Sequence, residues 1–223
     1  MSTRTRREND IPGYARIRQM NRGGYDRDLA MEILDSGLVA HVGFIHENRP
    51  MVIPMAYARI GERIYIHGAS TTRIVKANGG GVPASLTVTL VDGLVVARSA
   101  FHHSMNYRCA IVHGTARLVE DRQEEVDALA AITDHLLPGR WAECREMMLK
   151  EQKATGVLTL DMEHVSTKVR TGGPVDDRED LGTSIWAGVV PVVTALGQPL
   201  AASDVPAGTP APASIMAARR KFA

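Results

Sequence analysis

The sequence predicts a mainly β protein of the α+β class, built as an antiparallel barrel of six strands with a few peripheral helices. Short runs of β-branched and apolar residues are joined by tight turns at regular spacing. The alternation of strands and helices that builds a parallel sheet is missing, and so is the dinucleotide-binding pattern GxGxxG. The glycines at 79–81 follow a predicted helix instead of opening one.

Six runs of residues predict the strands. The first three are separated by short turns and form an antiparallel meander. The last run continues its pattern toward Val169. Gly114 interrupts the fifth run, and an isolated glycine in a long strand marks a bulge or a sharp bend of the kind that barrel strands need. The runs cover residues 38–46, 51–60, 63–67, 84–91, 107–118 and 155–160.

Helical patterns occupy segments before and between these strands. The clearest has acidic residues in its first turn and ends at Pro138-Gly139. The predicted helices cover residues 26–37, 71–78, 121–137 and 145–152.

The composition and its changes along the chain predict three parts. We expect a flexible N-terminal arm over 1–24, one barrel domain over 25–200, and a Pro/Ala-rich linker with a C-terminal tail over 201–223. The length of 223 residues fits a single domain with such ends. Only two Trp, five Tyr and three Phe are present, so the core must be aliphatic.

The charge balance excludes several functional classes. With 26 basic and 25 acidic residues the formal net charge is +1, which argues against a nucleic-acid or membrane-surface binder. No apolar run approaches the roughly 20 residues that a membrane span needs. The polar N-terminus is followed by no secretory signal, so we expect a cytoplasmic protein. Neither Cys109 and Cys144 nor the histidines form a metal-ligand pattern, and no metal site is predicted.

The clearest candidate site is the segment 64–78, IYIHGASTTRIVKAN. A strand ends at His67, and three hydroxyl residues then open a short helix. Arg73 and Lys76 are three residues apart and therefore share one helix face. Hydroxyls, free helix-start amides and two cations together would cradle a phosphate. The alternative is an ordinary capped helix with two solvated cations, and His67 could likewise be a plain packed or surface residue.

A second polar segment is AFHHSMNYR, residues 100–108, which we interpret as a donor-rich loop just before a strand. It could also be an ordinary polar surface loop. Ser104 has histidines nearby, but it lacks the sequence context of a nucleophile.

A third segment, 168–180, combines a Gly-Gly-Pro turn with four carboxylates. These could hold a divalent cation, but their spacing does not fit a calcium loop, and clustered loop carboxylates are usually solvated. Trp186, which follows, could be a core plug or an aromatic cover over a planar ligand.

The meander, the segment 64–78 and the stretch SLTVTLVDGLVVARSAFHHSMNYRCAIVHGTARLV together resemble the pyridoxamine 5'-phosphate oxidase-like flavoproteins. Within them the resemblance is greatest to the flavin-nucleotide-binding branch that includes the nitroimidazole-resistance (Nim) proteins. It runs from about Leu38 to about Trp186. It implies a six-stranded Greek-key split barrel that binds FMN, and a homodimer in which both chains complete each flavin site. The vitamin oxidases end in a strand that binds pyridoxal phosphate, whereas this chain ends in SIMAARRKFA.

The resemblance also implies roles for particular residues. The second strand would line the flavin ring, the hydroxyl and basic residues after the third strand would hold the phosphate, the SMNYR segment would lie near the flavin, and three later residues would reach the partner's FMN. His67, Tyr107 and Arg108 would face the substrate as candidate catalytic residues. The implied cofactor residues are Val52, Ile53, Pro54, Met55, Ser70, Thr71, Thr72, Arg73, Lys76, Ser104, Met105, Asn106, Lys168, Arg170 and Trp186.

The function that the sequence favours is an FMN-dependent oxidoreductase acting on a small molecule, either nitroreductase-like or oxidase-like. One alternative is a non-catalytic protein that binds flavin, haem or another small ligand. Another is a deazaflavin-dependent reductase of the same fold. Because a fold does not fix a function, the sequence leaves these three open.

Overall fold

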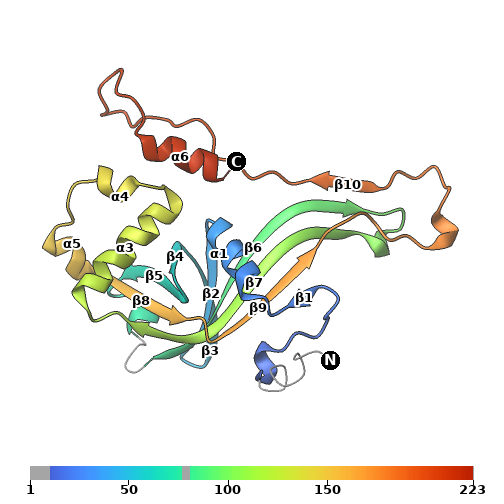
Figure 1. The fold of residues 1–223 in the computed structure, drawn as a ribbon, viewed down its shortest axis with the longest axis horizontal. Helices are drawn as coiled ribbons and strands as arrows, with labels where there is room; N and C mark the ends of the chain where they lie inside the picture. Colours follow the sequence, from blue (N-terminus) through green and yellow to red (C-terminus); the bar gives the residue numbers. More distant parts are fainter. Residues whose placement is uncertain (1–10, 77–80, 223) are drawn as a thin grey trace. The chain divides into compact units, whose positions relative to one another are not determined.

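The computed structural model describes residues 11–76 and 81–222, with only the backbone described at Lys76 (Figure 1). These residues form ten strands and six α-helices, and every strand pair of known register is antiparallel. The predicted mainly β fold with peripheral helices is therefore confirmed. The described chain divides into two compact units. The predicted division into an arm, a domain and a tail is a different partition and stays a prediction.

Unit 2 comprises Asp35–Leu86, His113–Glu163 and Thr194–Ala223. Its strands follow the order β3-β2-β6-β7-β8-β5-β4. Two of these strands, β6 and β7, are long and contribute residues to both units. The strands are β2 (Ala40–His46), β3 (Arg49–Met55), β4 (Tyr57–Ile60), β5 (Arg63–Ala69), β6 (Val82–Val96), β7 (Ser104–Leu118) and β8 (Thr155–Asp161).

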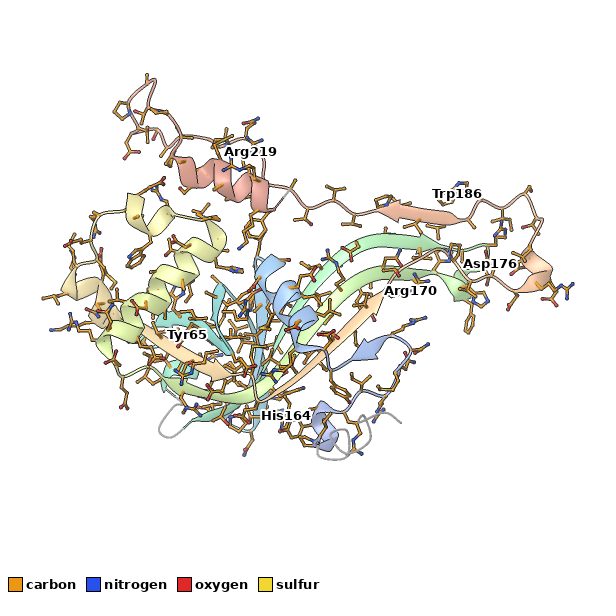
Figure 2. All side chains as sticks on the ribbon, in the orientation of Figure 1. Tyr65, His164, Arg170, Asp176, Trp186 and Arg219 are labelled. Atoms are coloured by element: carbon orange, nitrogen blue, oxygen red, sulfur yellow. The ribbon has the colours of Figure 1, made fainter. Side chains whose placement is uncertain are left out.

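The core of unit 2 forms where α3 (Arg122–Leu136) packs on β4, β5 and β8. Asp121 begins the helix because its side chain accepts a hydrogen bond from the Glu124 amide. Ala128, Leu129 and Ile132 form the buried face and pack against residues of the sheet. Tyr65, labelled in Figure 2, donates its hydroxyl to Glu124 at 2.7 Å, so a polar bond fastens the helix over the apolar contact. The sheet side of this cluster is Ala58, Tyr65 and Val157.

The predicted strand 51–60 is two strands, β3 and β4, in the structure. The break lies at Ala56, because β3 pairs with β2 whereas β4 pairs with β5. In the strand order β3 is an edge strand, which suits Pro50 and Pro54 because proline has no amide to donate. The predicted continuation beyond 160 is likewise a separate strand, β9 (His164–Arg170).

Unit 1 comprises Met1–Leu34, Thr87–Val112 and His164–Val193. Its strands follow the order β1-β9-β7-β6-β10, with β1 (Gly23–Gly24) and β10 (Gly188–Pro191) outside the sequence prediction. The β6–β7 hairpin forms its centre (Figure 1). Helix α1 (Arg27–Ser36) begins at Asp26, whose Oδ1 accepts from the amides of Asp28 and Leu29.

The remaining helices are short or near the C-terminus. The predicted helix 71–78 is four residues long in the described chain, as α2 (Arg73–Lys76), and the predicted 145–152 corresponds to α5 (Leu149–Ala154). The structure adds α4 (Arg140–Glu143) and α6 (Ala213–Lys221). Helix α6 packs within unit 2, where Ser214 donates to Glu143 and Lys221 donates to the His135 carbonyl. None of the described helices is long and apolar enough to cross a membrane.

His135 makes unit 2 sensitive to acid. Its Nε2 lies 2.6 Å from the Gly37 carbonyl, and its ring lies 4.8 Å from that of the fully buried Tyr57. Burial lowers the pKa of His135. The unfolded chain, which keeps the usual histidine pKa of about 6.5, therefore binds a proton first as the pH falls. The stability that the neutral imidazole contributes is present above that value and is lost below it.

We expect His135→Asn to reduce the slope of the unfolding free energy against pH between about 7 and 5. His41→Asn, at an exposed position of β2, should leave that slope unchanged. Urea denaturation at a series of pH values measures both. An undiminished slope in His135→Asn would rule out this assignment.

Candidate functional site

The candidate phosphate cradle lies where β5 ends and α2 begins. The buried side chains of Ile64 and Ile66 anchor β5, which pairs with β8 so that Gly68 faces Gly156. A Cβ at Gly156 would lie 2.7 Å from Val75, and one at Gly68 would lie 3.2 Å from Thr72. The two facing glycines therefore let the turn and α2 approach the sheet closely.

The cradle presents free polar groups on its outer side. Ser70, Thr71 and Arg73 are exposed, and no hydrogen bond or ion pair joins their side chains to another described residue. The Thr72 hydroxyl is buried and also lacks a partner. An unpaired guanidinium beside unpaired hydroxyls is the donor set that a phosphate needs. The side chain of Lys76, the second predicted cation, lies outside the described residues.

Two backbone amides of the cradle are not free, although the sequence predicts free amides there. The Ser70 amide donates to the Ala154 carbonyl at 2.9 Å, and the Thr72 amide donates to Ala69 at 2.8 Å. Both are therefore occupied, and α2 has too few residues for a strong dipole. The expectation of free helix-start amides is wrong at these two positions. These two amides are therefore not available to an anion.

His67 stands next to the cradle, near the end of β5. Its ring is half-buried, and neither nitrogen bonds to another described residue, with Nδ1 fully buried. Burial lowers the pKa of His67, so the ring is neutral at physiological pH. A neutral imidazole has a lone pair available to accept a proton or bind a metal ion.

The residues predicted to line the flavin ring form the edge strand β3. Val52 is 65% exposed and Pro54 is exposed, whereas Ile53 and Met55 are half-buried. The alternation leaves a short apolar strip on one face of the strand. Nothing in the structure tests their contact with a flavin, so their role stays a prediction.

Residues 104–106, predicted as part of a loop before the strand 107–118, already belong to that strand. The strand β7 begins at Ser104, directly after the 3₁₀-helix η2 (Ala100–His102). Pairing with β6 in the hairpin extends the strand to Ser104. The polarity of the local sequence does not reveal this pairing. Arg108 is bound to Asp92 of β6 through two contacts of 2.8 and 3.1 Å, and Tyr107 is half-buried. Asp92 would therefore partly neutralise the positive charge that Arg108 presents to a substrate.

Asn106 and Arg170, both predicted cofactor residues, bind each other. Arg170 is 9% exposed and donates to the Asn106 side chain at 2.5 Å and to the carbonyls of Gly172 and Gly173. All its described partners are neutral. These bonds fix the turn after β9 onto β7. Met105, between Ser104 and Asn106, is 49% exposed.

Lys168 and Trp186 complete the predicted set. Lys168 lies in β9 opposite Gly23 of β1. Trp186 is 62% exposed, so the core-plug interpretation is wrong and its ring is available to a ligand or partner. A Cβ at Gly188 would lie 2.9 Å from this ring, which therefore rests against the start of β10.

Sequence reasoning missed the roles of Asp176 and Asp177. Asp176 pairs with Arg98 and is only 2% exposed, and Asp177 contacts His102. The interpretation of these carboxylates as solvated is wrong for Asp176. Among the described residues, no cluster of three or more His, Cys, Asp or Glu could hold a metal ion. A pair of neighbouring acids about 75 residues after a basic run could have indicated this pairing. The basic run contains Arg98, His102 and His103.

A separate cleft of about 530 Å³ opens at the other end of β5. Arg63 there lies 3.3 Å from Glu124 and 3.3 Å from Asp161, so its charge is already compensated. The cleft therefore lacks the free cation that distinguishes the cradle.

The predicted site residues divide between the two units. His67, the β3 residues and the cradle belong to unit 2. The 104–108 segment, Lys168, Arg170 and Trp186 belong to unit 1.

The antiparallel strands and the few helices of the described chain place it among antiparallel β-barrel proteins. Residues 26–169 match the family model described as pyridoxamine 5'-phosphate oxidase, and the chain belongs to that family. No curated protein matches the chain.

Two solved structures are similar over nearly the whole chain. The flavocytochrome Anf3 from Azotobacter vinelandii is 36% identical, with a TM-score of 0.85 over 92% of this chain and 96% of that one. An FAD and haem binding protein from Mycobacterium smegmatis is 38% identical, with a TM-score of 0.84 over 89% of this chain and 97% of that one. A candidate 5-nitroimidazole antibiotic resistance protein from Bacteroides thetaiotaomicron is 19% identical, with a TM-score of 0.54 over 66% of this chain and 86% of that one, and shares the fold.

Proposed function

We propose that this protein binds a flavin and a haem and acts as an oxidoreductase on a small molecule. The observation that carries this proposal is the similarity to a flavocytochrome and to an FAD and haem binding protein. That similarity reaches 92% and 89% of the chain and thus extends past residue 169, where the family match ends. Bound flavin and haem would supply electron transfer, which protein side chains do not provide themselves.

The cradle would hold the flavin phosphate. Arg73 would neutralise the charge, while the Ser70 and Thr71 hydroxyls would donate hydrogen bonds to phosphate oxygens. Lys76 is the second cation on sequence grounds. The exposed apolar side of β3, which includes Val52 at 65% exposure, would pack against the flavin ring.

The identity of the flavin is a narrower proposal. The family resemblance implies FMN, whereas one of the two relatives of high identity is described as binding FAD. We propose FAD as the native flavin and keep FMN as the alternative. Reconstitution of the apoprotein with FAD, FMN and a deazaflavin in parallel would rank the three by affinity.

His67 is the candidate haem ligand. Iron binds the neutral form of imidazole, which burial favours at this position. The ring has no described hydrogen-bond partner to give up on binding iron. Its place beside the cradle would bring haem and flavin phosphate to the same end of β5.

We further propose a homodimer whose partner completes the flavin site. In support, unit 1 exposes large apolar side chains, with Phe101 at 88%, Val175 at 77% and Trp186 at 62%. Lys168, Arg170 and Trp186 would reach the partner's flavin. Light scattering after size-exclusion chromatography tests this, since a monomer would contradict the shared site.

The haem assignment predicts a spectroscopic loss. His67→Ala should remove or strongly weaken the Soret band of the haem-loaded protein, because the residue that would hold the iron is removed. His46→Ala, on β2, should retain the band. If the wild-type chain binds haem and His67→Ala keeps an unchanged spectrum, the ligand assignment is wrong. If the wild-type chain binds flavin and no haem, the haem half of the proposal fails.

The alternative function, a protein that binds the cofactor without catalysis, differs from the proposed one because it converts no substrate. A catalytic protein should pass electrons from a reduced nicotinamide or another donor through the flavin to an acceptor. Tight flavin binding with no reduction by NAD(P)H, and no activity on nitroimidazoles, would favour a carrier without turnover.

A further inference from the structure

Residues 171–187, called the strap here, connect β9 to β10 within unit 1, and two of them, Asp176 and Trp186, are labelled in Figure 2. Two neighbouring carboxylates, Asp176 and Asp177, hold the strap to the β6–β7 hairpin. Asp176 accepts from both the amide and the Nη1 of Arg98, each at 2.7 Å. Its side chain is only 2% exposed. Asp177 Oδ2 lies 3.0 Å from Nε2 of His102, the last residue of η2.

The two ends of the strap are fixed by other contacts. At its start, the Asn106 side chain donates to the Gly172 carbonyl at 3.0 Å. At its end, the Trp186 ring rests against Gly188, which pairs with Val96 in the β10–β6 register. Between Asp177 and Trp186 lie the 3₁₀-helix η3 (Arg178–Asp180) and a turn at Gly182, whose φ of 87° suits glycine.

We propose that two contacts fasten the strap to the hairpin. The Asp176–Arg98 fastening is permanent at neutral and alkaline pH, whereas alkaline solution breaks the pH-sensitive Asp177–His102 fastening. The part of the strap that carries Trp186 then becomes more mobile. The inference rests on contacts inside unit 1 and is independent of the proposed function. It makes Asp177 and His102 positioning residues for an exposed aromatic side chain.

The charges around His102 support this order of release. Asp177, Asp176 and Asp180 of the strap face the imidazole, and their charges raise the pKa of His102, with the Asp177 hydrogen bond as the main cause. On its own element, the Phe101 ring meets the imidazole edge-on at 5.2 Å. Because the pKa is raised in the folded state, this fastening is complete below the usual histidine value of about 6.5 and is lost as the pH rises through the raised value.

The Asp176 fastening responds to the opposite end of the pH scale. The hydrogen bond from the Arg98 amide is the main cause that lowers the pKa of Asp176, and the guanidinium adds to it. Its contribution is present above the usual carboxyl range and is lost only as the pH falls through the lowered value. Both fastenings therefore hold in mildly acidic solution, and only Asp176 holds in alkaline solution.

Trp186 can report on the strap directly once the second tryptophan, Trp141, is replaced. In Trp141→Phe, we expect the fluorescence anisotropy of Trp186 to fall as the pH rises from about 5.5 to about 9, with a midpoint above 6.5. Adding His102→Asn should abolish the transition and leave the low value at every pH. Adding Asp177→Asn should likewise abolish the transition, because it removes the other partner of the pH-sensitive fastening. His103→Asn is the matched control, since the His103 side chain bonds to the Ser99 carbonyl and to no strap residue among those described, and it should keep the transition.

Hydrogen exchange tests the permanent fastening. Asp176→Ala should raise the exchange rate of the Arg98 amide roughly tenfold or more at neutral pH, whereas His102→Asn should leave it nearly unchanged. Circular dichroism confirms that each variant is folded. The proposal is overturned if Trp186 shows no pH transition, if the transition persists in His102→Asn, or if the Arg98 amide exchanges equally fast in both variants.

Discussion

Replacing Arg73 and Lys76 together with alanine is expected to weaken flavin binding by roughly 100-fold or more, because each charge-assisted phosphate contact contributes about 1.5–3 kcal/mol. The exposed Arg73 has no described partner, so its charge is available to a ligand and its removal leaves no buried group unpaired. The fold should therefore be unaffected. Titration of the apoprotein with FAD and with FMN, followed by flavin fluorescence, measures the loss.

The control for this experiment is Arg220→Ala, which removes an exposed cation from α6. It should bind flavin as tightly as the parent chain. Ser70→Ala with Thr71→Ala should give a smaller loss, roughly tenfold, because neutral hydroxyls contribute less than cations. Unchanged affinity in the Arg73 and Lys76 double variant would show that the phosphate lies elsewhere.

Gly114→Ala is expected to destabilise the chain by about 3 kcal/mol, through a forced separation of strands. A Cβ at Gly114 would lie 2.3 Å from the Asp161 carbonyl oxygen and 3.1 Å from Leu160. The first of these atoms is backbone, so it cannot rotate away. Because β7 and β8 pair next to this point, through Ala116 and Leu160, the shift must spread into the unit 2 sheet.

Gly197→Ala is the matched control, since a Cβ there meets no atom within 4 Å. It should change the free energy of unfolding by less than about 0.5 kcal/mol. Chemical denaturation of the two variants beside the parent chain gives the comparison. Equal stability of Gly114→Ala and Gly197→Ala would mean that β7 and β8 are not packed as described.

The local sequence predicts a structural feature correctly where the signal for that feature lies within one segment of the chain. Asp121 and the acidic residues behind it predict the start of α3, and the β-branched run at 84–91 predicts part of β6. The sequence singles out Gly114 and predicts a bulge or a sharp bend there. The structure supplies a different reason, the approach of the Asp161 carbonyl from another strand.

Features that depend on distant partners could not be predicted. The break between β3 and β4 exists because the two halves pair with different strands, and no residue of the run announces it. The burial of Asp176 depends on Arg98, 78 positions earlier. In the same way, the occupied amide of Ser70 depends on the carbonyl of Ala154.

The candidate site was predicted in part. The side chains of Ser70, Thr71 and Arg73 are exposed and have no partner among the described residues, and their role in holding a phosphate stays a prediction. The neutral state of His67 follows from burial, which a strand sequence does not reveal. Lys76 and the flavin contacts of β3, β7 and Trp186 stay predictions.

The most direct test of the central claim is a native mass spectrum of the full chain, recorded with its visible absorption after expression with ample iron and riboflavin. We expect the mass of one flavin and one haem per chain, with a released mass that identifies FAD or FMN. The absorption spectrum should show flavin bands together with a Soret band. A colourless protein that takes up neither flavin nor haem on reconstitution would contradict it.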